Sequence, residues 1–405
     1  MEDFDVRDRT VFLRVDINIP LDPTTLQILD DTRIRGIRDT VSSLSSAKLV
    51  LGSHQSRPGR NDFTTLEPHA KRLQRYCSQH VNYVDDVTGP RAREAIRDLE
   101  SGEILVLDNL RFCAEENIDG PPEQLANTHM VKRLAPLFDL FVNDAFGAAH
   151  RSQPSLVGFA EVLPTAAGRL MERELEALNA VISTPERPCI YVLGGAKVED
   201  KVPVIENILK NGKADKILLG GVVGKVFLKA KGINLGPKNE EELAGLEKCV
   251  KKAQEILASF SNQIVMPIDL AINKNDKRAE VLIANMPTNE STLDVGEKTA
   301  TQYANSIGEA KTVVANGPLG VFEKNGFDFG TKTVLEAIGN SEAFTVIGGG
   351  HLAGLAEILG IESRFSHVST AGGAMLSLLA GEKLPVIEAL SRAADRGRTK
   401  GLPLT

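Results

Sequence analysis

The sequence of 405 residues has no tryptophan and no long apolar run. Its longest apolar runs, such as Lys48–Gly52 and Glu103–Leu107, are far shorter than the roughly 20 residues that cross a bilayer. The first ten residues, MEDFDVRDRT, are acidic and polar and lack the apolar stretch of a secretory signal. We therefore expect no membrane span and a cytoplasmic location.

Cysteine and net positive charge are also scarce. The four cysteines, Cys77, Cys113, Cys189 and Cys249, are far apart and form no CxxC or Cys/His cluster, so neither a zinc site nor a disulfide framework is indicated. The formal net charge is −7, and nucleic-acid binding depends on cationic surface, so we expect no nucleic-acid partner. The length suggests two or three domains, and 42% hydrophobic with 25% charged residues is typical of globular proteins.

Short apolar runs alternate with helical patterns along the whole chain. Such alternation predicts an α/β fold of parallel sheets covered by helices on both faces. About ten strands are too many for one doubly wound domain, so we expect two. The predicted strands are Thr10–Val15, Lys48–Gly52, Val81–Val84, Glu103–Asp108, Asp139–Asn143, Cys189–Leu193, Lys216–Leu219, Gln263–Met266, Lys311–Ala315 and Ala343–Ile347. The predicted helices include Thr32–Ser46, Leu66–Ser78, Thr88–Leu99, Val198–Lys210, Glu240–Ser259, Thr331–Gly339 and His351–Leu359.

The boundary between the two domains is predicted to be a helix over residues 166–182. Leu170, Leu175, Leu178 and Ile182 have the apolar spacing of a helix face. Prolines precede and follow this stretch, as expected for a helix that links two domains. An ordinary crossover helix fits the same pattern.

Polar and basic residues follow the strands of the first half. Ligands of open parallel sheets bind at the carboxyl ends of the strands. Residues 1–170 contain 17 Arg and 3 Lys, whereas residues 171–405 contain 7 Arg and 20 Lys. Each arginine alone is typical of a surface charge, and the asymmetry fits compositional drift equally well. Together with a histidine, however, they suit a ligand that carries phosphate and carboxylate. The residues are Asp16, Asn18, Arg33, His54, Arg57, Arg111 and Arg151.

Glycines follow the strands of the second half, in LGGAKVEDK, LLGGVVGK, ANGPLGVFE, VIGGGHLAG and VSTAGGA. One such turn is typical of any strand–helix connection, but five indicate backbone that approaches a nucleotide's phosphates. Lys197 and Lys201 lie four residues apart at a helix start, where cations oppose the helix dipole unless an anion binds there. Two solvated lysines are the alternative. Glu323 is either a ligand of a ribose hydroxyl or a surface acid.

Common phosphate motifs fit poorly. The stretch GGVVGKV resembles a Walker A loop, but it is one residue short and Val226 replaces the required Ser or Thr. The run GGGHLAG at 348–354 is only a weak dinucleotide pattern. Protein-kinase HRD and DFG motifs and a GxSxG elbow are absent from the sequence.

In this order, the segments resemble the phosphoglycerate kinase family over essentially the whole chain. VFLRVDINIP resembles the opening R-x-D-x-N-x-P signature, and eight further segments follow in register: TRI, SHQSRP, DNLRF, NDAFGAAHR, LGGAKVEDK, ANGPLGVFE, VIGGG and HVSTAGGA. The resemblance implies two Rossmann-like domains joined by a helix, with a hinged cleft. It implies a substrate domain over 1–165, a linker helix over 166–182, a nucleotide domain over 183–387 and a segment, 388–405, that returns to the first domain.

The resemblance also implies the ligands: 3-phosphoglycerate or 1,3-bisphosphoglycerate on the first domain, and ADP or ATP with Mg²⁺ on the second. The implied substrate-binding residues are Asp16, Ile17, Asn18, Arg33, His54, Gln55, Ser56, Arg57, Arg111 and Arg151. The implied nucleotide-binding residues are Gly195, Ala196, Lys197, Lys201, Gly220, Gly221, Gly296, Asn316, Pro318, Glu323, Gly348, Gly349, Gly350, His351 and Leu352. Arg33, Lys197, Lys201, Gly372 and Gly373 would carry the catalysis.

Two positions depart from the family pattern. His351 stands where many members have an aspartate that helps to hold magnesium, and imidazole is a poor ligand for this hard cation. Ala371 replaces a third glycine of the STGGG run. Both departures resemble an archaeal branch of the family, and they leave the magnesium ligands unknown.

Two rival functions stay open at this point. A nucleotide-linked oxidoreductase that used GGGHLAG would bind nicotinamide and leave the arginines without a phosphoryl donor. A binding module without turnover is opposed by the presence of Arg33, Lys197 and Lys201. A monomer and a homodimer fit the sequence equally well.

Overall fold

The computed structural model describes residues 3–399, and the chain divides into two compact units. One unit holds the residues up to Leu175 together with those from Lys383 onward, and the other is Glu176–Glu382. The sequence-based domain boundaries stay a prediction, and residues 400–405 of the C-terminal segment lie outside the described residues. Within 3–399, none of the helices combines the length and the apolar character that a membrane crossing requires.

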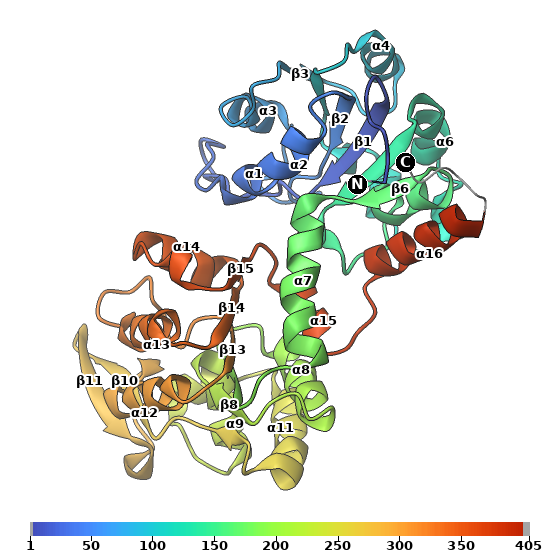
Figure 1. Ribbon diagram of the computed structural model, residues 1–405. Helices are drawn as coiled ribbons and strands as arrows, with labels where there is room; N and C mark the ends of the chain where they lie inside the picture. The colour runs from blue at the N-terminus through green and yellow to red at the C-terminus, as the bar shows by residue number, and fades with distance from the viewer. Residues whose placement is uncertain (1–2, 400–405) are drawn as a thin grey trace. The chain divides into compact units, whose positions relative to one another are not determined.

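The first unit contains a six-stranded sheet in the order β3-β4-β2-β1-β5-β6, and every pairing is parallel (Figure 1). From the central strand β1 the chain first fills one side of the sheet and then crosses to β5 on the other. This reversal places a topological switch point between β1 and β5, where open sheets bind ligands. The strands are β1 (Thr10–Val15), β2 (Lys48–Gly52), β3 (Val81–Val84), β4 (Ile104–Leu107), β5 (Leu140–Asp144) and β6 (Thr165–Ala167).

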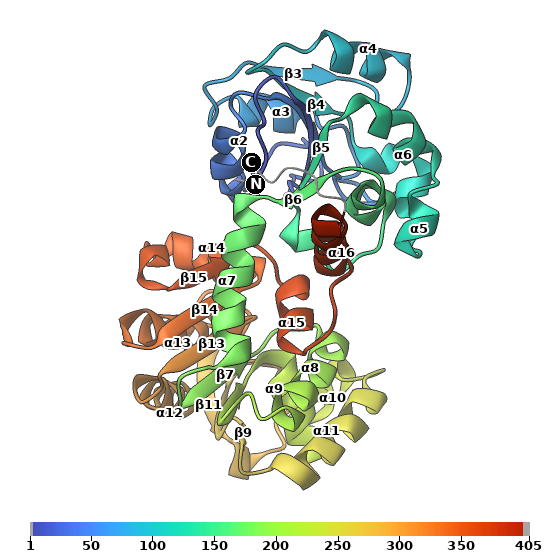
Figure 2. The same ribbon diagram turned by 45° about the vertical axis from the view of Figure 1, so that its right-hand side comes forward.

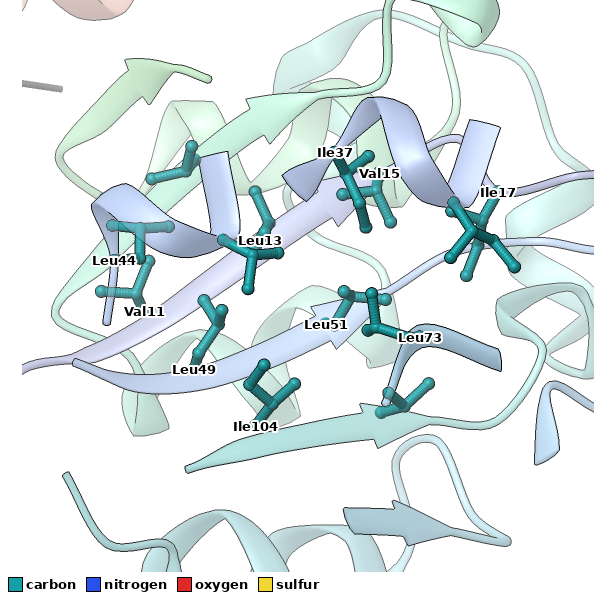
Figure 3. Close-up of a cluster of buried hydrophobic side chains, with 14 of the residues drawn as sticks. Val11, Leu13, Val15, Ile17, Ile37, Leu44, Leu49, Leu51, Leu73 and Ile104 are labelled. Carbon is teal, nitrogen blue, oxygen red and sulfur yellow. The ribbon is translucent and has the colours of Figure 1, made fainter. Parts of the chain in front are cut away.

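Alternation along β1 divides its side chains between two apolar layers. Val11, Leu13 and Val15 enter a core between the sheet and the helices of one face, as Figure 3 shows. Phe12 points to the other face, where its ring stacks on Phe138 with centroids 5.0 Å apart. The helices of this unit are α1 (Thr32–Gly36), α2 (Arg38–Ser43), α3 (Glu67–Leu73), α4 (Pro90–Asp98), α5 (Pro122–Leu125), α6 (His129–Leu134) and α16 (Pro385–Thr399), with short turns η1 (Leu110–Phe112), η2 (Ala114–Asn117), η4 (Phe146–Ala148), η6 (Phe159–Glu161) and the π-helix η5 (Pro154–Gly158).

The second unit repeats the architecture with a parallel sheet in the order β15-β14-β13-β7-β8-β9, which places its switch point between β7 and β13. Helices α12, α13 and α14 supply one apolar layer, and α8, α9 and α11 lie side by side (Figure 2). The confirmed fold class is therefore α/β with two parallel sheets. The strands are β7 (Cys189–Leu193), β8 (Lys216–Leu219), β9 (Ile264–Val265), β13 (Thr312–Asn316), β14 (Phe344–Gly348) and β15 (His367–Ser369), and the helices are α8 (Val198–Lys210), α9 (Gly221–Ala230), α10 (Pro237–Glu242), α11 (Glu247–Phe260), α12 (Glu297–Gly308), α13 (Phe329–Asn340), α14 (Gly350–Ile358) and α15 (Gly373–Leu379).

A small antiparallel sheet in the second unit was not predicted. It consists of β10 (Asp269–Lys274), β11 (Lys277–Leu282) and β12 (Thr292–Val295), in the order β11-β10-β12. The turn between β10 and β11 has positive φ at Asn275 and Asp276, 52° and 57°, which is the backbone of a tight hairpin. The Asn-Asp pair in NKNDK is the sequence signal of this hairpin. β11 is polar and half-exposed, and the mostly buried strands β10 and β12 mix polar with apolar residues, so none of the three has the continuous apolar run by which buried strands are recognised.

Several predicted helices have other bounds in the structure. The predicted helix 240–259 is two helices, because Gly245 adopts a φ of +85° between α10 and α11. The predicted helix 32–46 is divided into α1 and α2 at Ile37. The helix predicted to begin at residue 166 is α7 (Arg169–Ser183), because Ala166 pairs with Val142 as part of β6.

Asp144, at the end of β5, holds the start of α7. Its carboxylate is fully buried and accepts hydrogen bonds from the Thr40 hydroxyl at 2.6 Å and the Met171 N–H at 2.9 Å. A Cβ on Gly168 would lie 2.2 Å from the nearer carboxylate oxygen. Only glycine therefore allows the chain to pass this close before the helix begins.

We predict that Asp144→Ala lowers the free energy of unfolding by about 2–3 kcal/mol, because a buried hydroxyl and a buried N–H lose their acceptor. Urea denaturation followed by circular dichroism measures the change. The matched control is Asp39→Ala, which removes a half-exposed ion pair with Arg173 on the same helix and should cost less than about 1 kcal/mol. Equal losses in the two variants would contradict the capping role of Asp144.

Candidate active site

Asp16 and Arg33 form an ion pair at the carboxyl end of β1. Nη1 of Arg33 donates to Oδ2 of Asp16 at 2.8 Å and to the carbonyl of Asn18 at 3.0 Å. Burial by itself would raise the pKa of Asp16, but Arg33, His54 and Arg14 outweigh it and lower the pKa to about 2. Asp16 is therefore a carboxylate at neutral pH that holds Arg33 at the strand end.

His54 follows β2 and lies between two guanidinium groups. Its Nδ1 is 3.1 Å from Nη2 of Arg14, and its Nε2 is 3.4 Å from Nη1 of Arg151. Burial lowers the pKa of His54 well below its usual range; Arg14, Arg111 and Arg151 add to this effect, and Asp16 opposes it. The imidazole is therefore neutral at physiological pH.

Arg111, on η1 after β4, lies on the same side of the sheet. Its Nη1 donates to the carbonyl of Ser56, and its Nη2 lies 3.5 Å from Oε1 of Gln153. Among residues 3–399, its buried Nε has no hydrogen-bond acceptor. Burial and the neighbouring Arg151 lower the pKa of Arg111 to about 10, so it keeps its charge at neutral pH. Arg57 is exposed and near enough to contribute to this repulsion.

The backbone around these residues is held by amide side chains. The Ser56 N–H donates to Oδ1 of Asn18 at 2.9 Å, and the side chain of Gln55 makes hydrogen bonds to the N–H and carbonyl of Ile19. The side chain of Ile17 is wholly buried in the core, and its N–H donates to the Ser53 hydroxyl at 3.1 Å. Ile17 and Gln55 therefore shape this site rather than offer their side chains to a ligand.

Arg14 belongs to the same cluster, although the sequence did not indicate it as a candidate site residue. Arg14 follows Phe12 on the same face of β1, and its side chain is wholly buried. Its Nε donates to the Ser155 hydroxyl at 2.7 Å, and its Nη2 lies 3.7 Å from Oε1 of the buried Glu116. The available signal was an arginine inside the apolar run VFLRV, since a central strand leaves no side chain in solvent.

In the second unit, the ammonium of Lys201 lies at the switch point between β7 and β13. Its Nζ donates to the carbonyls of Gly194, after β7, and Asn316, at the end of β13; the second distance is 3.2 Å. Burial lowers the pKa of Lys201 to about 8; Lys197 adds to the effect and Asp200 opposes it. Both partners are neutral carbonyls, so the ammonium has no carboxylate to balance it in these contacts.

Glycines bring the backbone close around this lysine. Gly195 and Gly317 have φ values of +85° and +82°, and a Cβ on Gly317 would lie 2.3 Å from Nζ of Lys201. A Cβ on Gly221 would lie 2.6 Å from the N of Gly195. The glycines that follow β7, β8 and β13 therefore bring backbone without side chains close to the ammonium of Lys201.

The end of β14 and the start of α15 join the same cluster. Gly349 has a φ of +94°, and its Cβ would lie 3.5 Å from Nδ2 of Asn316. A Cβ on Gly372 would lie 3.4 Å from the Cα of Gly349. Nδ2 of Asn316 is buried, and none of residues 3–399 accepts a hydrogen bond from it. An unpaired amide donor, glycine backbone without side chains and an ammonium together suit an anion such as a phosphate.

The remaining predicted nucleotide residues differ in packing and exposure. Some glycines are required by packing, since a Cβ on Gly220, Gly296 or Gly348 would overlap the side chain of a neighbour. The ring of His351 is exposed and lies 5.5 Å from the ring of Phe322. Ala196, Lys197, Glu323, Gly350 and Gly373 are also exposed, whereas Pro318 and Leu352 are buried.

The side chains do not form a magnesium site of their own. Within the part of the chain that the structure describes, no three His, Cys, Asp or Glu side chains converge as a metal would require. An exposed imidazole at position 351 does not supply the oxygen that Mg²⁺ prefers. The residue at position 351 therefore does not fit as a ligand of magnesium.

Comparisons with known proteins agree over nearly the whole chain. The family model of phosphoglycerate kinase matches residues 1–382. A phosphoglycerate kinase of Methanobacterium bryantii is 49% identical over 402 residues, which cover 98% of this chain and 98% of that protein. One of Pyrococcus horikoshii is 46% identical over 404 residues, which cover 98% of each chain.

Solved structures give the same result. The crystal structure of phosphoglycerate kinase from Pyrococcus horikoshii OT3 has a TM-score of 0.93 and 45% identity, and the match covers 98% of this chain and 99% of that chain. The phosphoglycerate kinase structure from Coxiella burnetii has a TM-score of 0.76 and 32% identity, with 97% and 99% covered. These matches, together with the two switch-point sites described above, show that the chain belongs to the phosphoglycerate kinase family.

Proposed function

We propose that this chain transfers a phosphoryl group reversibly between 1,3-bisphosphoglycerate and ADP, which yields 3-phosphoglycerate and ATP. Family membership makes the chain a kinase of this kind. The observation that carries the assignment is the pair of switch-point sites, one rich in arginine and the other in glycine and lysine. An acidic, phosphorylated substrate suits the first, and a nucleotide's phosphates suit the second.

The two ligands are assigned to the two parts of the chain. In this proposal residues 1–165 and 388–405 hold the glycerate substrate, 166–182 link the parts, and 183–387 hold the nucleotide. Asp16 and Asn18 face the carboxyl and hydroxyl end of the substrate, and His54, Arg57, Arg111 and Arg151 hold the phosphate that stays. Because each ligand has its own unit, transfer requires the units to bring the reacting groups into line.

The chemistry needs neither a covalent intermediate nor a strong base, because the acceptor oxygen is already a carboxylate or a phosphate. Catalysis is then positioning and charge stabilisation of the transferring group. Arg33 and Lys201 supply the cations, and the N–H groups at Gly372 and Gly373 supply donors at a helix start. Lys197 and the glycine turns bind the nucleotide phosphates, and Glu323 binds the ribose.

Magnesium enters with the nucleotide in this proposal. Since position 351 is a histidine, the ion is held by nucleotide phosphates and water, and no step is assigned to a protein-bound metal. A cytoplasmic location, a monomeric or dimeric state and the absence of nucleic-acid partners stay predictions from the sequence.

A coupled assay tests the function. The purified protein, given 3-phosphoglycerate, ATP and Mg²⁺, should produce ADP at a rate that depends on all three. An oxidoreductase would instead consume NADH in the presence of a carbonyl substrate without ATP. Turnover without 3-phosphoglycerate, or binding without turnover, would overturn the assignment.

We predict that Lys201→Ala lowers kcat by about 10²–10³-fold, because a desolvated cation beside the transferring group is lost. KM for 3-phosphoglycerate should change little, since that site lies in the other unit. Steady-state kinetics measure both parameters. Lys210→Ala, an exposed position on the same helix, is the control and should keep wild-type turnover. Near wild-type kcat in Lys201→Ala would remove this lysine from the mechanism.

We predict that kcat/KM for ATP falls as the pH rises through about 8. The pKa of Lys201 in the free protein is about 8, and only the protonated ammonium attracts phosphate. Activity that depends on Lys201 is therefore complete below this pH and is lost above it. A profile from pH 6 to 9.5 shows the inflection, and the residual activity of Lys201→Met should lack it. A wild-type profile that stays level to pH 9.5 would contradict the proposal.

We predict that Arg57→Ala and Arg151→Ala raise KM for 3-phosphoglycerate about tenfold with little change in kcat, whereas Arg33→Ala mainly lowers kcat. The first two contact a phosphate that is the same in ground and transition states, which is uniform binding. Arg33 acts where charge develops. Initial-rate kinetics of the three variants separate these effects, and parallel changes in both parameters for all three would refute this division.

A further inference from the structure

His54 is in contact with a hydrogen-bond donor on each side. A neutral imidazole has one N–H and one acceptor nitrogen, whereas a guanidinium offers only N–H groups. Arg14 therefore meets an acceptor at Nδ1 only if the proton of His54 is on Nε2. The contact at Nδ1 is the shorter, 3.1 Å against 3.4 Å at Nε2, and it comes from a side chain that is wholly buried.

The other side of the ring then has two donors and no acceptor. The Nε2–H of His54 and Nη1 of Arg151 face each other at 3.4 Å. Arg151 is only partly buried, so a ligand can reach this point. An anionic oxygen placed between the two groups would accept from both.

Arg14 is held in place by a buried carboxylate and a hydroxyl. Its Nε donates to Oγ of Ser155 at 2.7 Å, and the Ser155 N–H donates to Oε2 of Glu116 at 3.0 Å. The Ser155 hydroxyl also donates to Glu116, and Nη1 of Arg14 donates to the carbonyl of Val15. Three polar groups from β1, η2 and η5 are therefore joined where all are fully buried.

We propose that Arg14, held by Glu116 and Ser155, is a positioning residue that fixes His54 as the neutral Nε2–H tautomer. The Nε2–H of His54 and Nη1 of Arg151 then form a binding site with two hydrogen-bond donors for one anionic oxygen of the substrate. The identity of that anion rests on the proposed function, but the tautomer does not.

Three of the four charged groups that face His54 disfavour its protonated form, and Asp16 favours it. Arg14 and Asp16 face His54 from β1 and the residue after it, Arg111 from η1, and Arg151 from the segment after η4. Protonation of His54 would direct a second N–H at the buried Arg14, which has no acceptor to offer. The pH profile of substrate binding at Nε2–H of His54 and Arg151 should therefore show no inflection from His54 between pH 5.5 and 8.5.

Nitrogen-15 NMR of histidine-labelled protein, free of substrate, tests the tautomer directly. The expected spectrum has an unprotonated Nδ1 and a protonated Nε2 for His54, unchanged from pH 5.5 to 8.5. Addition of 3-phosphoglycerate should shift the Nε2–H resonance. A protonated Nδ1, or a titration of His54 near the usual histidine range, overturns the proposal without any measurement of activity.

The double variant Arg14→Met/Glu116→Gln tests the positioning role and leaves neither charge buried alone. In a folded variant His54 should titrate or change tautomer, KM for 3-phosphoglycerate should rise about tenfold or more, and kcat should stay within about twofold. An unchanged His54 spectrum overturns the role of Arg14. Ser155→Ala, which keeps both charges, should give a smaller change of the same kind and serves if the double variant does not fold.

Lys225→Met/Glu242→Gln is the matched control. It removes another ion pair with a buried lysine, 2.6 Å between Nζ and Oε2, in the other unit. The control should leave the His54 spectrum and KM for 3-phosphoglycerate unchanged, and a change equal to that of the test variant would mean that lost stability is the cause. If no preparation turns over 3-phosphoglycerate, the proposed function fails while the spectrum of the free protein still decides the tautomer.

Discussion

Arg14 and Lys201 are buried near the carboxyl ends of the strands of two parallel sheets. The surrounding structure must therefore compensate for the desolvation of these two cations. Burial of a cation is costly unless hydrogen bonds and opposite charge offset it. Arg14 has Glu116, a hydroxyl and a carbonyl as partners, whereas Lys201 donates to two neutral carbonyls. Burial lowers the pKa of Lys201 because its partners carry no negative charge to offset the desolvation, and a bound phosphate would raise this pKa again.

The two units answer the same electrostatic requirement with different chemistry. In the first, planar guanidinium groups are fixed by Asp16, Gln153 and backbone carbonyls, which gives a directional set of donors. In the second, glycines leave the strand ends without side chains, so that bare backbone lies close around one ammonium. The first arrangement suits a small, strongly charged acid, and the second suits phosphate groups.

Both sites depend on topology as much as on residue type. β1 and β7 are central strands from which the chain first fills one side of the sheet and later the other. The residues that follow them, Asp16 and Gly194, therefore lie at the point where the loops diverge. Among residues 3–399, Nδ2 of Asn316 at the end of β13 and Nε of Arg111 after β4 are buried donors without an acceptor.

By itself the sequence determined the α/β class, most strands of the two parallel sheets and the residues that follow them, because buried strands leave a continuous apolar signal. It also indicated Lys201, from its place at a helix start, and several arginines, from their place after strands, as candidate site residues, and their roles stay predictions. It did not indicate the antiparallel sheet, whose strands mix polar with apolar residues, or the start of α7, which follows a three-residue edge strand. Only the tertiary structure decided that Arg14 is buried beside Glu116 and that His54 lies between two guanidinium groups. Contacts between residues 40 or 100 positions apart depend on how the chain crosses the sheet, and no local spacing encodes them.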